Sequence, residues 1–284
     1  MSFFIGKVMY TGYLRKMLVE STSPVMYSLY FSTGEKCPLN SYIGHTITLS
    51  FNGSLQCVAC TRDIQKTFNQ GYCYPCFMKK AACDSCIVKP ELCHFAEGTC
   101  REPEWGLSHC MQPHIVYLAN SSNVKVGITR CTQVPIRWMD QGAVQALPLY
   151  QVNSRLQSGL VEVIVKDFLS DKTNWRTMLK STPDSVDLLK LWVDLESTHK
   201  IEDRFQSDLR LENQVTPLYQ SDKTRLFTYP VKQYPEKVST INILKTPTFT
   251  SRLQGIKGQY LILDEGVINI RKYTGYHCKF SVES

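Results

Sequence analysis

Several features of common protein classes are missing from this sequence of 284 residues. No apolar run approaches the length of about 18 residues that a membrane-spanning helix requires. The opening residues, MSFFIGKVMYTGYLRK, lack the charged start, long apolar stretch and cleavage site of a signal peptide. The six histidines include no HExxH pair, and no GxxxxGK[ST] loop occurs. We therefore expect a cytoplasmic protein that contacts no membrane and has neither zinc-protease nor P-loop chemistry.

The composition is that of an ordinary globular protein, with 43% hydrophobic and 20% charged residues. Lys and Arg number 32 against 25 Asp and Glu, which gives a formal net charge of +7. The basic surplus lies in residues 111–180 and 222–284, whereas 181–221 carries four basic and eight acidic residues. Because a basic surplus attracts polyanions, we expect the first two segments to contact a nucleic acid.

Cysteine is abundant and unevenly placed. Nine of the twelve cysteines lie within residues 57–110, a segment with little apolar periodicity and therefore little capacity to build a core. Thiols stay reduced in the cytoplasm, so these cysteines are interpreted as metal ligands rather than as disulfides. Bound metal would then supply folding free energy to this segment.

The spacing divides these cysteines into two sets. Two CxxC pairs predict one zinc ion, and a less regular run, with Cys83 left out, predicts a second metal ion. Four thiolates leave no open coordination position, so both ions are expected to be structural. Zinc and an iron–sulfur cluster use the same thiolates, which leaves a metal or redox sensor open for the second set. The expected ligands are Cys57, Cys60, Cys73 and Cys76 for the first ion, and Cys86, Cys93, Cys100 and Cys110 for the second.

The strand and helix signals predict an α+β protein of several parts, with β-rich ends that strands from both termini can complete as a small barrel or sandwich. A turn is expected at residues 51–54 and an apolar helix at 158–169. The expected parts are an N-terminal β element (1–56), a cysteine-rich zinc-binding segment (57–110), an α/β domain (111–182), a helical linker or packing segment (183–223) and a C-terminal β domain (224–284).

Residues 114–137, HIVYLANSSNVKVGITRCTQVPIR, give the most specific functional signal. They predict a β-hairpin and resemble the GIY-YIG nuclease superfamily. Ile115-Val116-Tyr117 stands at the first motif and Lys125-Val126-Gly127 at the second, with Arg137 and Glu162 on the helices that follow. The whole chain is similar to an uncharacterised bacterial family, domain of unknown function 2797, through GYCYPCF, PELCHFAEGTCR, VKVGITR, RWMDQGA and GIKGQYLILDEGVINIRKYTGY.

The superfamily resemblance implies a GIY-YIG-like α/β domain and an endonuclease, dependent on Mg²⁺ or Mn²⁺, that hydrolyses phosphodiester bonds in DNA or RNA. Glu162 would hold the ion, Arg137 would hold the scissile phosphate, and Tyr117 would orient or deprotonate the attacking water. Lys125 departs from the pattern, because nuclease members usually have Tyr there; a lysine can hold a phosphate or handle a proton. Further phosphate contacts are expected from Arg130, Arg176, Arg271 and Lys272.

A non-catalytic, zinc-containing module that binds DNA or RNA with the same fold is the alternative. Arg137 and Glu162 would then form a structural ion pair, because a carboxylate within GLVEVIVKDFL needs a basic or metal partner if it is buried. A cleft open to solvent around Tyr117 and Arg137 would favour the enzyme.

Overall fold

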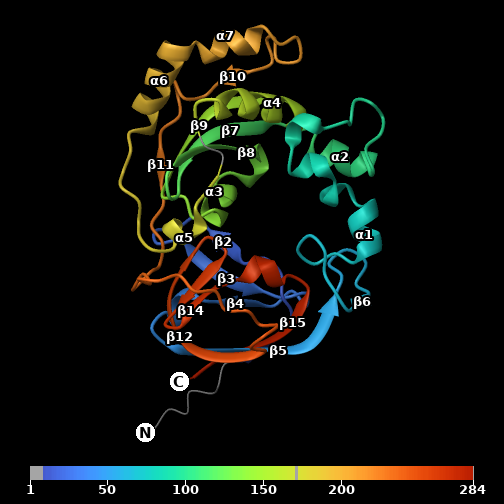
Figure 1. Cartoon of the computed structure of the whole chain (residues 1–284), viewed down its shortest axis with the longest axis vertical. Helices are drawn as coiled ribbons and strands as arrows, with labels where there is room; N and C mark the ends of the chain where they lie inside the picture. The colour runs from blue at the N-terminus through green and yellow to red at the C-terminus, as the bar shows by residue number, and fades with distance from the viewer. Residues whose placement is uncertain (1–8, 170–171, 284) are drawn as a thin grey trace.

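The computed structural model describes residues 9–169 and 172–283, and Figure 1 shows three parts. A terminal sheet lies at the bottom of this view, a central sheet with its helices lies at the top, and the cysteine-rich segment lies along one side. The strands pair antiparallel in each sheet. The chain is therefore a mixed α+β protein, as the sequence predicts.

The terminal sheet combines strands from both ends of the described chain. Its order is β1-β15-β5-β12-β13-β14, with β6 paired to β5. β1 pairs with β15 from Met9 opposite Ser281 to Tyr13 opposite His277, so the two β-rich ends form one structural unit. The strands are β1 (Met9–Tyr13), β5 (Thr46–Gln56), β6 (Asp63–Ile64), β12 (Thr248–Lys257), β13 (Tyr260–Leu263), β14 (Gly266–Asn269) and β15 (Tyr276–Val282), and the 3-10 helix η6 (Ile270–Tyr273) precedes β15.

The turn expected at residues 51–54 is wrong, because β5 continues through it. Partners on β15 shift from Cys278 opposite Phe51 to Tyr276 opposite Leu55, so β5 carries extra residues there. Gly53 has a φ of 92°, a backbone conformation that glycine adopts at little cost. The turn signal therefore marks a β-bulge rather than a chain reversal.

A small sheet packs on the terminal sheet. It has the order β2-β3-β4, and its buried side chains, among them Tyr27, Leu29 and Phe31, share one core with Leu49 and Phe280 of the terminal sheet. Its elements are β2 (Leu18–Glu20), β3 (Met26–Tyr30), β4 (Lys36–Pro38) and η1 (Asn40–Tyr42).

The central sheet has the order β10-β9-β7-β8, so β8 lies at its edge, and β11 also pairs with β9. Side chains of β7 alternate between two cores. Ile115, Tyr117 and Ala119 join the core of the terminal sheet, whereas Val116 and Leu118 join a core formed with the helices. The strands are β7 (His114–Asn120), β8 (Val124–Arg130), β9 (Gln145–Val152), β10 (Thr216–Pro217) and β11 (Arg225–Leu226).

Helices cover the second face of the central sheet, where α4, α6 and α7 supply most of the buried helical side chains. The helix expected at 158–169 begins earlier, because the Ser154 side chain caps its N-terminus by accepting from Gln157 N. In the described chain no helix is both long and apolar enough to cross a bilayer. The elements here are η5 (Cys131–Gln133), α3 (Ile136–Asp140), α4 (Arg155–Lys166), α5 (Trp175–Met178), α6 (Leu188–His199) and α7 (Ile201–Gln206).

The cysteine-rich segment consists of short helical turns. It arches from β6 to the side of the central sheet in Figure 1 and packs its η4 turn against α4. Gly159 of α4 permits this contact, since a β-carbon there would lie 2.4 Å from Glu91 N. The elements are α1 (Tyr74–Lys79), η2 (Ala81–Cys83), η3 (Ser85–Ile87), η4 (Pro90–Leu92) and α2 (Pro103–His109).

Candidate functional site

A cleft of about 720 Å³ lies where the three parts meet. The edge strand β8 lines it from Lys125 to Arg130, and opposite walls come from the cysteine-rich segment and the terminal sheet. All four residues to which the sequence assigns a catalytic role reach this cleft, from four different elements: Tyr117, Lys125, Arg137 and Glu162. The fold therefore brings the four side chains implied by the superfamily resemblance to one cleft.

Tyr117 and the second motif lie side by side on neighbouring strands. Tyr117 pairs with Gly127, and a β-carbon on Gly127 would lie 2.9 Å from the Tyr117 hydroxyl oxygen. Gln141, at the end of α3, donates from Nε2 to the Tyr117 hydroxyl at 2.5 Å, and Lys125 Nζ donates to Gln141 Oε1 at 2.5 Å. Gln141 thus joins the two motif residues in one hydrogen-bonded chain, a role that no sequence motif indicated.

Burial determines the protonation of Tyr117. Its side chain is 1% exposed, and this burial raises the pKa of Tyr117, although Arg137 and the hydrogen bond from Gln141 oppose the rise. Tyr117 is therefore a neutral phenol near neutral pH, which can orient a water molecule but is a poor base.

Glu162 lies one turn beyond Gly159 on α4, near the edge strand. Its side chain is 12% exposed, and its Oε2 lies 3.6 Å from Lys166 Nζ on the following turn. Glu162 faces the cleft rather than the apolar core beneath α4. Mg²⁺ binds through one or two carboxylates together with water and substrate phosphates, so a single carboxylate in a solvent-filled cleft fits such an ion.

The cleft is basic. Six Lys and Arg side chains line it against two carboxylates, those of Asp140 and Glu162. Asp140 is itself engaged, because it pairs with Lys16 and accepts from Gln259 Nε2 at 2.9 Å. The six basic residues are Lys16, Lys125, Arg130, Arg137, Arg155 and Arg271.

The residues expected to contact phosphate divide into two pairs. Arg130 and Arg271 line the cleft, whereas Arg176 and Lys272 lie outside its lining. Arg176 instead stacks on Trp175, with its guanidinium carbon 4.4 Å from the ring centroid. Lys16 and Arg155 reach the cleft without having been predicted, since only the packing of the parts places them there.

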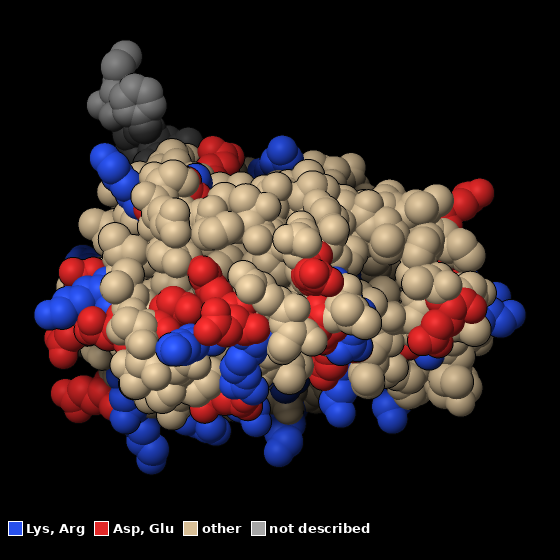
Figure 2. Space-filling model, turned by 90° about the horizontal axis from the view of Figure 1, so that it is seen from above, with Lys and Arg blue, Asp and Glu red and all other residues tan. Residues whose placement is uncertain are grey.

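The molecular surface above α6 and α7 has a different character. Figure 2 looks down on this end and shows charged side chains of both signs along one half of the face and few charges along the other half. A polyanion would therefore find its attractive surface in the cleft rather than at this end.

The first cysteine set has the geometry of a zinc site. The Sγ atoms of Cys57, Cys60, Cys73 and Cys76 lie within 4.8 Å of one another, and Cys60 Sγ lies 3.7 Å from Cys73 Sγ. A tetrahedral zinc ion with Zn–S bonds of about 2.3 Å separates its sulfur ligands by about 3.8 Å. These four thiols can therefore hold one zinc ion.

Backbone amides prepare this set for metal. Burial opposes ionisation of Cys57, but the backbone N–H groups of Cys60, Cys73 and Ala59 outweigh it and lower the pKa of Cys57 to about 6. Among them, Cys73 N lies 3.2 Å from Cys57 Sγ. A thiolate, which is the form that binds zinc, is thus favoured near neutral pH.

The four cysteines expected for the second ion line one small cavity of about 10 Å³: Cys86, Cys93, Cys100 and Cys110. Cys83 is not among the lining residues and lies near Asn69 instead. Cys110 hydrogen-bonds to Cys93, which lowers the pKa of Cys93 to about 6. Among the described residues, however, the Sγ atoms of these four cysteines do not all lie within 4.8 Å of one another, unlike those of the first set. The second four-thiolate site therefore remains a prediction.

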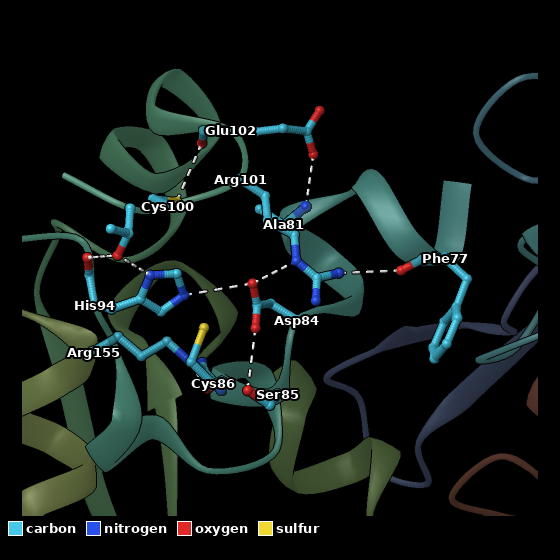
Figure 3. Close-up of polar contacts among 11 residues, drawn as sticks. Phe77, Ala81, Asp84, Ser85, Cys86, His94, Cys100, Arg101, Glu102 and Arg155 are labelled. Carbon is cyan, nitrogen blue, oxygen red and sulfur yellow. Dashed lines mark hydrogen bonds and ion pairs between the residues drawn. The ribbon is translucent and has the colours of Figure 1, made fainter. Parts of the chain in front are cut away.

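Polar groups surround this cavity, as Figure 3 shows. Asp84 lies 2.7 Å from Arg101 Nε and 3.5 Å from His94 Nε2, and His94 Nδ1 lies 2.6 Å from the Thr99 hydroxyl. Asp84, Cys86 and His94 also bring one ligand atom each within 4.8 Å of one another. Asp84 and His94 were not predicted as ligands, and they supply oxygen and nitrogen atoms beside the thiols.

Arg155 connects the second cysteine set to the cleft. Its guanidinium donates to Ile87 O at 2.7 Å and to Cys86 O at 3.3 Å, while its backbone N–H donates to Cys110 O at 2.8 Å. Burial lowers the pKa of Arg155, but the neighbouring thiols oppose this, so it remains charged. A positive charge therefore lies between the cysteines and the cleft.

The fold and the site together define a mixed α+β protein with a cysteine-rich segment that can bind metal and a basic cleft beside it. The chain belongs to the family described as "Protein of unknown function (DUF2797)", which matches residues 44–278. No curated protein and no solved structure matches the chain.

Proposed function

We propose that the protein processes nucleic acid as a GIY-YIG-like endonuclease that requires Mg²⁺ or Mn²⁺. One observation carries the proposal: the four residues indicated by the superfamily resemblance, Tyr117, Lys125, Arg137 and Glu162, line one basic cleft. The pairing of Tyr117 with Gly127 places the two resembling motifs opposite each other on β7 and β8 and supports the same conclusion.

Each residue has a separate role in phosphodiester hydrolysis. The Arg137 guanidinium holds the scissile phosphate and offsets the charge that grows on its oxygens. Tyr117, a neutral phenol held by Gln141, orients the attacking water, and Lys125 contributes a second positive charge at the same wall. Glu162 would hold the divalent ion, which would supply the chemistry that activates water and stabilises the leaving oxygen.

The cysteine-rich segment has a structural role in this proposal. Zinc at both cysteine sets would fix the segment as the wall of the cleft opposite β8. Closed four-thiolate sites offer no position to substrate, so neither zinc ion takes part in hydrolysis.

A cleavage assay tests the proposal. Wild type and Glu162→Gln are incubated with single-stranded, duplex and branched DNA and RNA in Mg²⁺ or Mn²⁺. Glutamine keeps the size of the side chain but binds a divalent ion poorly, so cutting should disappear in this variant. Glu212→Gln, an exposed residue between α7 and β10, is the matched control and should cut like wild type.

A non-catalytic nucleic-acid-binding module is the second candidate. The observation in its favour is that Lys125 stands where nuclease members usually have tyrosine. Lys125 donates to Gln141, and Gln141 in turn donates to the Tyr117 hydroxyl. The cleavage assay, together with a binding measurement on the same substrates at several salt concentrations, separates the two candidates. Salt-sensitive binding by wild type without cutting in either metal ion would select the binding module and reject the endonuclease.

A further inference from the structure

Arg271 reaches the cleft from the terminal sheet and is held in place by the cysteine-rich segment. It lies on η6, just before β15, and its Nε donates to Gln70 Oε1 at 2.7 Å. Gln70 belongs to the loop between the two CxxC pairs and also lines the cleft. One hydrogen bond therefore joins two parts of the protein and aims a guanidinium at the cleft.

Arg271 and Arg137 form a pair of like charges in this cleft. Both side chains line it. Burial lowers the pKa of Arg271, and the positive charge of Arg137 lowers it further. Within residues 9–169 and 172–283, no carboxylate lies within 4.0 Å of either guanidinium. Asp140, the acidic neighbour of Arg271, is already bound to Lys16 and Gln259.

Two arginines that line one cleft, with no carboxylate within 4.0 Å of either in the described chain, are stabilised by a bound anion. Phosphate suits them, because a guanidinium fork binds two phosphate oxygens at once. The two arginines come from different elements of the cleft, α3 and η6, so a ligand with several phosphates can contact both at once. A nucleic-acid strand meets this requirement with its successive phosphates.

The enclosure of the cleft favours an unpaired strand. β8 and α3 line it on one side, Gln70, Tyr72 and Val88 of the cysteine-rich segment line it on the other, and η6 adds Arg271. A volume of about 720 Å³ is that of a pocket for a compact ligand, whereas a duplex is contacted across a broad outer surface. Grooves for single strands combine basic side chains with aromatic rings, and Tyr72 supplies a ring here.

We propose that the cleft binds an unpaired nucleic-acid segment, with Arg137 and Arg271 on different phosphates of the same strand. This inference rests on the proposed function and adds the form of its substrate. It also makes the terminal sheet part of the binding site, although the motifs for catalysis lie elsewhere in the chain.

Binding measurements without added Mg²⁺ or Mn²⁺, which prevents cutting and leaves zinc bound to the cysteines, test the inference. Fluorescence anisotropy of labelled oligo-dT, oligo-U and a DNA duplex of equal length is recorded over a series of salt concentrations. Wild type should bind both single strands more tightly than the duplex. Arg271→Gln should weaken single-strand binding about tenfold. It should also reduce the slope of log K against log salt by about 0.7, the value for one lost phosphate contact on a single strand.

Two further variants make the result specific. Arg252→Gln removes an exposed arginine of the same sheet that likewise donates Nε to an oxygen, Gly44 O at 2.6 Å, but lies outside the cleft; it should bind like wild type. Arg271→Lys keeps the positive charge but lacks the guanidinium group that binds two phosphate oxygens. It should therefore keep the slope of log K against log salt and bind more weakly than wild type. This variant also decides the question if Arg271→Gln fails to fold, since full wild-type affinity in Arg271→Lys would remove the argument for a guanidinium clamp.

The outcomes are distinguishable. Single-strand binding that Arg271→Gln and Arg252→Gln leave equally unchanged would overturn this inference while the proposed function stands. Tighter binding to the duplex than to either single strand would also overturn it. Failure of wild type to bind any of the three probes would contradict the proposed function itself.

Discussion

The hydroxyl oxygen of Tyr117 lies over Gly127 on the neighbouring strand, in the space that any side chain at position 127 would need. A β-carbon there would approach the hydroxyl oxygen to 2.9 Å and Cζ of the ring to 3.0 Å. Tyr117 is buried and bound to Gln141, so it cannot move aside freely. The two motifs of the site are therefore coupled by direct contact.

Gly127→Ala should lower the free energy of unfolding by about 1–3 kcal/mol, because the added methyl group overpacks this contact. Urea unfolding measures the change. In a Tyr117→Phe background, where the nearest atom is gone, the same substitution should cost at least about 0.5 kcal/mol less. An equal loss of unfolding free energy in both backgrounds would show that the Tyr117 hydroxyl is not what excludes a side chain at position 127.

Gly159→Ala should separate α4 from the cysteine-rich segment. The new β-carbon would meet backbone atoms, Glu91 N at 2.4 Å and Pro90 C at 2.6 Å, which cannot rotate away. We expect a net loss of about 1–3 kcal/mol in unfolding free energy, even though alanine favours a helix over glycine by about 1 kcal/mol. Val163→Ala, at an exposed position on the same helix, is the control and should change stability by less than about 0.5 kcal/mol.

Metal content should follow the two cysteine sets separately. Purified wild type should hold about two zinc ions per chain, and Cys60→Ser and Cys110→Ser should each lose about one, measured by elemental analysis. Cys83→Ser should keep both, since Cys83 lies outside both sets. A brown protein with visible absorption would instead indicate an iron–sulfur cluster at the second set.

Lys257 should make stability depend on pH. Its side chain is fully buried, donates to Ser181 O at 3.1 Å, and lies over the rings of Tyr229 and Tyr234. Burial lowers the pKa of Lys257 from 10.5 to about 8. The unfolded chain therefore binds more protons between these two pH values, and the cost of burying the charge, about 3 kcal/mol, is full below pH 8 and vanishes above 10.5.

Urea unfolding of wild type and Lys257→Met at several pH values measures this cost. The free energy of unfolding of wild type, relative to that of Lys257→Met, should rise by up to about 3 kcal/mol as the pH rises from 8 toward 10.5. The pKa values of Tyr229 and Tyr234 are raised by burial, so these rings stay neutral over much of this range. If the difference in unfolding free energy between the two proteins stays constant with pH, the pKa of Lys257 is not lowered in the folded protein.

Local patterns predicted the parts of the site that local structure determines. The hairpin that carries Tyr117 and Lys125 and the helices that carry Arg137 and Glu162 follow from short-range periodicity. The early start of α4 was missed, although Ser154 followed three residues later by Gln157 is a capping pattern that could have revealed it. That start matters, because it places Arg155 in the first turn of α4, between the cysteines and the cleft.

Other parts of the site depend on contacts between distant segments. Lys16, Gln70 and Arg271 reach the cleft only because the terminal sheet and the cysteine-rich segment pack around β8. No periodicity in a single sequence encodes such packing. Cysteine spacing did select four thiols that line one cavity, because ligand spacing is itself a local constraint on a short segment.

The pairing of β1 with β15 also constrains the order in which the molecule can form during synthesis. Residues 9–13 must wait for residues 277–281 before their side of the sheet has a partner, and β5 waits for the same strand. Contacts so distant along the chain form slowly, after local hairpins and helices. Arg271 precedes β15 directly, so the cleft acquires its full charge only after the segment that leads into β15 has been synthesised. The cleft proposed here to bind nucleic acid is therefore complete only after this late step.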